Sequence, residues 1–111
     1  MTHKYRARRT VIDGHTFDSN GEARRYAELR LMERAGAISG LTLQPEFVLQ
    51  EAFTDATGKK WRAIVYRADF AYVEAGQNVV EDFKGVETAE FKLKRKIFLN
   101  RYRDLVFRVT K

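Results

Sequence analysis

The sequence contains no cysteine and only one proline, and none of its apolar runs is long. The absence of cysteine excludes a disulfide scaffold, thiol catalysis and any thiolate zinc site. No apolar run approaches the ~20 residues that a membrane-spanning helix needs. No apolar stretch follows the basic N-terminal residues, as one would in a secretory signal. We therefore expect a cytoplasmic protein with no membrane partner.

The apolar residues are sufficient for one folded domain. The chain has 111 residues, of which 44% are hydrophobic and 13% aromatic. A chain of this length forms one domain and buries roughly two thirds of its extended surface. We expect a single domain over residues 1–111.

Positive charge is concentrated at the two ends of the chain. Residues 1–10 carry four bases and no acid, residues 11–83 carry eight bases and twelve acids, and residues 84–111 carry nine bases and three acids. Basic ends around an acidic middle favour a nucleic-acid partner, although a net charge of +6 also suits an ordinary surface. The N-terminal arm, residues 1–9, is either a phosphate-binding segment or an unstructured terminus with incidental charge. Its candidate contacts are Lys4, Arg6, Arg8 and Arg9.

Turn and cap signals divide the first half of the chain into short elements. Asp13-Gly14 predicts a hairpin between residues 10–12 and 15–17, because both turn residues tolerate positive φ. Ser19 and Glu22 have the spacing of a capping box, which predicts a helix to residue 35. Runs rich in β-formers predict strands over 47–53, 61–73 and 79–84, joined by short turns into an antiparallel meander.

A second helix and a last strand follow. Thr88 is a candidate cap for a helix to about residue 102, and residues 105–110 are predicted to be a strand. A helix between two strands of one sheet is a crossover, so the last strand should run parallel to its neighbour. The predicted fold is α+β, with a central mixed sheet and the core order α-β-β-β-α-β.

Two acids and one lysine on the central strands are the residues most suggestive of chemistry. Asp82 and Lys84 are two residues apart in a predicted strand, so they project from the same face. Asp69 lies on the preceding strand, and a short turn can bring it close to Asp82. Carboxylates of this kind hold Mg²⁺ or Mn²⁺, and a lysine can offset charge in phosphodiester hydrolysis. The alternative is a solvated polar face with a weak surface ion pair.

The order helix, strand, Asp, turn, strand, Asp-x-Lys, basic helix and strand resembles the PD-(D/E)xK nuclease superfamily over roughly residues 19–110. Several segments also resemble a family of small phage-associated proteins related to Holliday junction resolvases: 21–26, 43–47, 68–70 and 80–85. The resemblance implies a restriction-endonuclease-like core in which Asp69 and Asp82 are the motif acids and Lys84 is the motif lysine. Ala68 stands where the motif has proline.

The resemblance extends to three neighbouring positions. Glu22 matches an acid that many members supply from the first helix, although it also suits the capping box. The backbone carbonyl of Phe83 is a candidate metal ligand. Gln44 is either adjacent to the site or a loop amide that satisfies backbone groups. Glu81 projects to the opposite face from Asp82, and we do not assign it to the metal.

The second predicted helix is dense in cations. Phosphate contact is one interpretation and a solvated helix face is the other. The candidate residues are Lys92, Lys94, Arg95 and Lys96.

Three functions are consistent with these features. The first is a Mg²⁺-dependent DNA endonuclease acting on branched DNA such as a four-way junction, in which Mn²⁺ can substitute for Mg²⁺. Two cuts on a junction call for two active sites, so this function implies a homodimer. The second is a non-catalytic nucleic-acid-binding module of the same fold, and the third is a nickase or restriction-like nuclease. A phage origin, with action in a bacterial host, rests on the resemblance alone.

Overall fold

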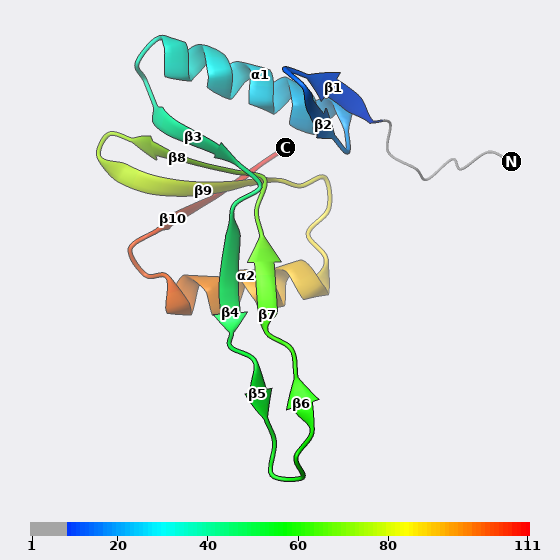
Figure 1. Cartoon of the computed structure of the whole chain (residues 1–111). Coiled ribbons are helices and arrows are strands. Elements are labelled where there is room, and N and C mark those ends of the chain that lie inside the picture. Colours follow the sequence, from blue (N-terminus) through cyan, green and yellow to red (C-terminus); the bar gives the residue numbers. More distant parts are fainter. Residues whose placement is uncertain (1–8) are drawn as a thin grey trace, which may run out of the picture.

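The computed structural model describes residues 9–111 and has the predicted α+β class, with helices and short strands interspersed (Figure 1). Lys4, Arg6 and Arg8 lie outside the described residues. The two helices are α1 (Asn20–Arg34) and α2 (Ala89–Arg101). The strands are β1 (Thr10–Ile12), β2 (His15–Phe17), β3 (Ser39–Leu43), β4 (Glu46–Gln50), β5 (Phe53–Thr54), β6 (Lys60–Trp61), β7 (Ile64–Arg67), β8 (Phe70–Glu74), β9 (Gln77–Phe83) and β10 (Val106–Thr110).

The central sheet has four strands in the order β10-β9-β8-β3. β9 is antiparallel to β8, and β10 is parallel to β9 after the crossover through α2, as predicted. The two faces of β9 alternate as expected for a strand. Val79 packs in one core with residues of α1, and Val80 packs in a second core with residues of α2.

The sequence prediction for the strands was wrong in two places. It missed β3, a short strand whose pairing with β8 is irregular and whose Gly40 has a φ of +64°. It also treated 47–53 and 61–73 as continuous strands. The first is divided between β4 and β5, and the second among β6, β7 and β8. β4 pairs with β7 and packs near α2, whereas β5 pairs with β6 further out.

Residues 39–74 therefore form one long, bent hairpin (Figure 1). Its base, β3 and β8, belongs to the central sheet, and its outer part runs through β4 and β7 to β5 and β6. At the bend, Gln44 has a left-handed φ of +50°. Backbone hydrogen bonds from Gln44 N to Asp69 O, at 2.9 Å, and from Ala68 N to Pro45 O, at 3.1 Å, join the two arms across the bend.

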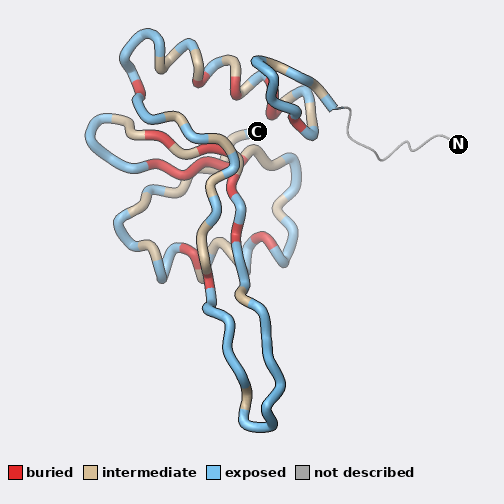
Figure 2. Tube along the Cα trace, viewed as in Figure 1, coloured by how far each residue is buried: buried red, intermediate tan, exposed pale blue. Residues whose placement is uncertain are grey.

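The predicted N-terminal hairpin and first helix are confirmed. Asp13 and Gly14 take positive φ values of 53° and 78° in the turn between β1 and β2. The Ser19 side chain caps α1 by accepting from Glu22 N at 3.1 Å. α1 buries Tyr26 and Leu29 against the sheet. In Figure 2, most buried residues lie in the helices, the central sheet and the inner part of the long hairpin, whereas the tip of that hairpin is exposed.

None of the helices in the described part of the chain is both long and apolar enough to cross a membrane.

Candidate functional site

Asp69 and Asp82 are joined by reciprocal hydrogen bonds where the long hairpin meets the central sheet. Asp69 N donates to Asp82 Oδ1 at 2.8 Å, and Phe83 N donates to Asp69 Oδ2 at 2.7 Å. The register of β8 and β9 places Phe70 opposite Glu81, so the next pair outward is Asp69 and Asp82. Each carboxylate is thus positioned by the backbone of the other strand, and the predicted convergence of the two acids is confirmed.

One oxygen of this pair lacks a partner. Asp82 is 1% exposed, and its Oδ2 is buried with no hydrogen-bond partner among residues 9–111. Burial raises the pKa of Asp82 to about 6, against the lowering effects of the Lys84 charge and the Asp69 amide. The charge of Lys84 therefore offsets the burial of an ionised Asp82 carboxylate only in part.

Glu22 lies on the other side of Asp69, in the first turn of α1. Its burial, followed by the charge and hydrogen bond of Asp69, raises the pKa of Glu22 to about 7. Burial also raises the pKa of Asp69, although the Phe83 amide and Glu22 partly oppose it. The two neighbouring carboxyl groups therefore resist being ionised at the same time. The backbone N–H of Glu22 donates to the Ser19 cap, and its side chain lies close enough to Asp69 to interact with it.

A cleft of about 320 Å³ opens beside these acids and is lined by Glu22, Gln44 and Asp69, together with residues of β2. Gln44 therefore lies next to Asp69, as one of the two sequence interpretations expected. Its backbone N–H donates to Asp69 O at the bend. Asp18 is near enough for its charge to raise the pKa of both Glu22 and Asp69. The sequence reasoning missed Asp18, because it directly precedes the helix cap and matches no motif.

Lys84 follows Asp82 on β9 and acts electrostatically on both aspartates. Its Nζ lies 5.0 Å from the centre of the Phe91 ring on α2. It also lines a second cleft of about 460 Å³, whose other cationic lining residues are Arg67 and Lys94. The three predicted residues Asp69, Asp82 and Lys84 therefore lie together, with Lys84 on the side of α2.

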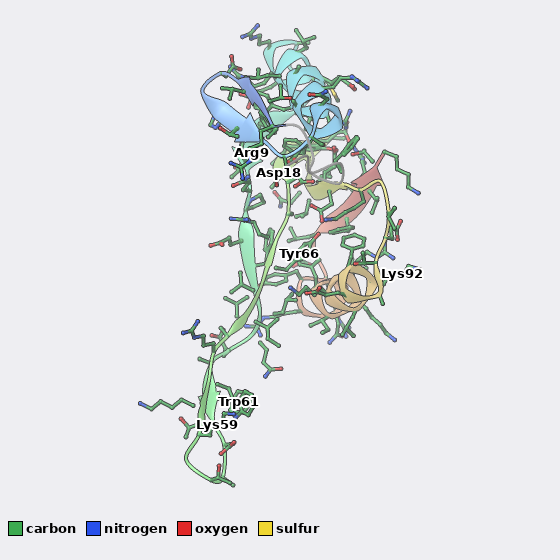
Figure 3. The ribbon with its side chains drawn as sticks, turned by 90° about the vertical axis from the view of Figure 1, so that its right-hand side faces the viewer. Arg9, Asp18, Lys59, Trp61, Tyr66 and Lys92 are labelled. Carbon is green, nitrogen blue, oxygen red and sulfur yellow. The ribbon has the colours of Figure 1, made fainter. Side chains whose placement is uncertain are left out.

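The cations predicted on α2 differ in their surroundings. Lys94 pairs with Glu90 at 3.3 Å, and Arg95 pairs with Glu87 at 2.9 Å. Lys92 and Lys96 are exposed and form no salt bridge within residues 9–111. In Figure 3, Lys92 lies on the outer surface of α2, and Arg9 lies near the N-terminal hairpin.

Glu81 lies on the opposite face of β9, as its alternation with Asp82 predicted. Its carboxylate is 0% exposed and accepts two hydrogen bonds from the Arg25 guanidinium, at 2.7 and 2.9 Å. Tyr72 OH donates to it at 2.7 Å and Thr110 Oγ1 at 3.1 Å. Burial would raise the pKa of Glu81, but these hydrogen bonds outweigh it and leave the pKa lowered. This ion pair fixes α1 to the sheet one turn after Glu22.

The packing of Gly21 holds the start of α1 close to β9. A Cβ at this position would lie 2.4 Å from the tip of the Phe83 ring. Phe83 projects toward α1, on the same face as Glu81. Glycine thus permits the approach that places Glu22 beside Asp69.

The donor set suits a hard divalent cation, although it does not form a complete cage. Within residues 9–111, no group of three or more acidic, histidine or cysteine side chains is arranged to hold a metal ion. Mg²⁺ commonly binds through one or two carboxylates and fills its remaining positions with water and substrate phosphate. The unpartnered Asp82 oxygen and the adjacent Asp69 carboxylate fit that mode.

The fold and the site define an α+β protein with a pair of mutually positioned, largely buried aspartates at the end of its sheet. The chain belongs to the family described as "Protein of unknown function (DUF1064)", whose sequence model matches residues 2–111. Comparison with curated proteins and with solved structures found no match.

Proposed function

We propose that the protein is a Mg²⁺-dependent endonuclease related to the PD-(D/E)xK superfamily, which hydrolyses phosphodiester bonds in branched DNA. The observation that carries this proposal is the Asp69–Asp82 pair, in which one buried carboxylate oxygen has no partner. A purely structural carboxylate with that burial would be expected to have both oxygens satisfied. Support also comes from the Asp-x-Lys spacing and from β10, which is parallel to β9.

The electrostatics of the site favour a cation. Burial raises the pKa of Asp82 to about 6 and that of Glu22 to about 7, and it also raises the pKa of Asp69. Three neighbouring acids with raised pKa values are typical of functional sites. A divalent ion would favour their ionised forms and release protons on binding.

Each residue has a distinct role in the proposed reaction. Asp69 and Asp82 would hold the ion, with the Phe83 carbonyl as a further ligand and Glu22 as a neighbouring acid. When bound, Mg²⁺ would supply a Lewis acid for the phosphate and lower the pKa of the attacking water. Lys84 would offset the negative charge that develops on the phosphate in the transition state.

The distribution of positive charge supports a nucleic-acid substrate. Arg67, Lys84 and Lys94 line the larger cleft beside α2, and exposed Lys92 and Lys96 lie on the same helix. Lysine and arginine side chains at such positions bind backbone phosphates and make binding depend on salt. The expectation from the sequence that Lys4, Arg6 and Arg8 bind backbone phosphates is part of this proposal. Two cuts on one four-way junction require two sites, so we propose a homodimer.

The proposal is tested with end-labelled four-way junction, linear duplex and single-stranded DNA, each incubated with the protein in Mg²⁺ or EDTA. We expect Mg²⁺-dependent cleavage that is strongest on the junction. Asp82→Asn and Lys84→Ala should each abolish cleavage, whereas the matched control Asp104→Asn, at an exposed position after α2, should leave it intact.

The outcomes separate the candidate functions. DNA binding without cleavage of any substrate would contradict the enzyme and favour a binding module. Equal cleavage of junction and duplex would contradict the branched substrate. Cleavage that survives Asp82→Asn would show that the reaction occurs elsewhere in the protein.

A further inference from the structure

The tip of the long hairpin, β5 and β6 with their turn, projects away from the rest of the protein (Figures 1 and 3). None of its residues belongs to either hydrophobic core. Trp61 is eight residues from Asp69 in the sequence, so the strand rise puts the tip up to about 26 Å from the candidate site. The tip is thus unnecessary for the cores and lies within reach of any large molecule bound at the site.

The turn of this hairpin is held in one conformation by the Asp55 carboxylate. Oδ1 accepts from Thr57 N at 2.8 Å, from Thr57 Oγ1 at 2.6 Å and from Lys59 N at 3.1 Å. Oδ2 accepts from the indole Nε1 of Trp61 at 2.9 Å. The hydrogen bonds from Thr57 and Trp61 lower the pKa of Asp55 to about 2. The carboxylate therefore fixes the orientation of the indole ring.

The hairpin presents an ordered aromatic surface to solvent. The rings of Phe53 and Trp61 are stacked across the two strands, with centroids 6.3 Å apart and an interplanar angle of 17°. The two residues are 46% and 44% exposed. Lys59 Nζ lies 4.1 Å from the centre of the Trp61 ring. A cross-strand pair stabilises a hairpin only modestly, and the exposed parts of both rings remain open to a ligand.

Three exposed cations, Lys59, Lys60 and Arg62, are neighbours of Trp61 in the sequence, and Lys59 lies over the Trp61 ring. None of them forms a salt bridge with another residue in the described range 9–111. Aromatic rings next to cations that track a phosphate backbone are the features with which proteins bind single-stranded nucleic acid. A second copy of the chain is a poorer partner, because a symmetric contact at this tip would bring like charges together.

We propose that the β5–β6 hairpin binds an unpaired segment of nucleic acid, with a base stacked on Trp61 and with Lys59, Lys60 and Arg62 contacting phosphates. A base on the indole would displace the Lys59 ammonium from the ring toward the phosphate of that nucleotide. The inference rests on the proposed function in taking nucleic acid as the substrate. It adds that the substrate carries unpaired bases up to about 26 Å from the bond that is cut.

Trp61 is the sole tryptophan of the chain, so its emission reports on the hairpin alone. The wild-type protein is titrated in EDTA, which prevents metal-dependent cleavage, with a single-stranded DNA oligonucleotide, the corresponding blunt duplex and the RNA counterpart. We expect the single strands to quench Trp61 and the duplex to leave its emission nearly unchanged. If the single strand binds, as judged by the anisotropy of a dye on the DNA, without quenching Trp61, the inference is wrong. Emission that changes with protein concentration alone would assign the tip to a second copy and also overturn it.

Substitutions test the contribution of stacking. Trp61→Ala should weaken single-strand binding about 5- to 150-fold, as expected for loss of one stacked base, and Trp61→Phe should restore most of it. The matched control is Leu31→Ala, at a 63% exposed apolar residue on α1, which should leave binding unchanged. Far-UV circular dichroism should match the wild type in all three variants, because neither site belongs to a core.

The two proposals fail separately. Quenching of Trp61 without Mg²⁺-dependent cleavage would contradict the enzyme and leave the hairpin contact standing. Cleavage that depends on Asp82, together with unchanged Trp61 emission and full affinity of Trp61→Ala, would contradict the hairpin contact alone.

Discussion

Removing one partner of the ion pair between Arg25 on α1 and Glu81 on β9 should strongly destabilise the protein. Arg25→Met removes the guanidinium and keeps much of the apolar stem. It leaves a carboxylate that is 0% exposed with only the Tyr72 and Thr110 hydroxyls as side-chain donors. Breaking one side of a buried ion pair costs about 3–5 kcal/mol. Because two donors remain and the Arg25 side chain is 17% exposed, we expect the lower end of that range, about 3 kcal/mol.

This loss is a large part of the stability of a small domain, which is typically about 5–15 kcal/mol. It corresponds to a fall in Tm of about 10–20 °C. The free energy of unfolding is measured by urea denaturation followed by far-UV circular dichroism, since Trp61 lies outside the cores. The matched control is Arg24→Met at the adjacent exposed position, which should change stability by less than about 0.5 kcal/mol.

A double variant separates the buried charge from the packing. Arg25→Met combined with Glu81→Leu removes both charges, so it should recover most of the stability that the single variant loses. A loss below about 1 kcal/mol for Arg25→Met, or equal losses for Arg24→Met and Arg25→Met, would refute the reasoning.

Three further predictions concern the helix approach, the acids and the basic helix. Gly21→Ala should destabilise the protein by about 1–3 kcal/mol, because the added Cβ meets the Phe83 ring. The control Gly85→Ala, at a position with open space around it, should leave the stability unchanged. Equal urea midpoints for the two variants would contradict this prediction. Burial raises the pKa of Asp82 from 3.8 to about 6, so its contribution to stability is fully present below about pH 4 and lost as the pH rises through about 6. The loss reaches up to about 3 kcal/mol without metal, and a urea series should show that Asp82→Asn removes it. Lys92→Ala should lower the slope of log affinity for DNA against log salt concentration by about 1, whereas Lys94→Ala, whose lysine is paired with Glu90, should change it less.

Local signals were sufficient to predict several elements from the sequence. Asp13-Gly14 specified the first hairpin and Ser19 specified the start of α1, because both signals act within a few residues. The alternation of β9 correctly separated Asp82 from Glu81. The nearness of Asp69 to Asp82 followed from antiparallel pairing across one short turn.

Features that depend on contacts between distant segments could not be predicted in this way. The interruption between β7 and β8, at Asp69, lies opposite the bend at Gln44. Gln44 bends the chain through a left-handed φ, and no specific sequence signal predicts that conformation. The Arg25–Glu81 pair joins residues 56 positions apart, and a single arginine on a charged helix does not identify its partner. The double role of Glu22 likewise depends on how α1 packs on β9.

We propose that Asp69 and Asp82 together bind a divalent cation. The direct measurement is to add substoichiometric Mn²⁺ to isotope-labelled protein and follow the backbone amide resonances, since a bound paramagnetic ion broadens its neighbours. We predict selective broadening of the Asp69 and Phe83 amides, sharp resonances for the β5–β6 hairpin, and loss of the broadening in Asp82→Asn. Amides of Asp69 and Phe83 that stay sharp, or that broaden equally in Asp82→Asn, would contradict the claim.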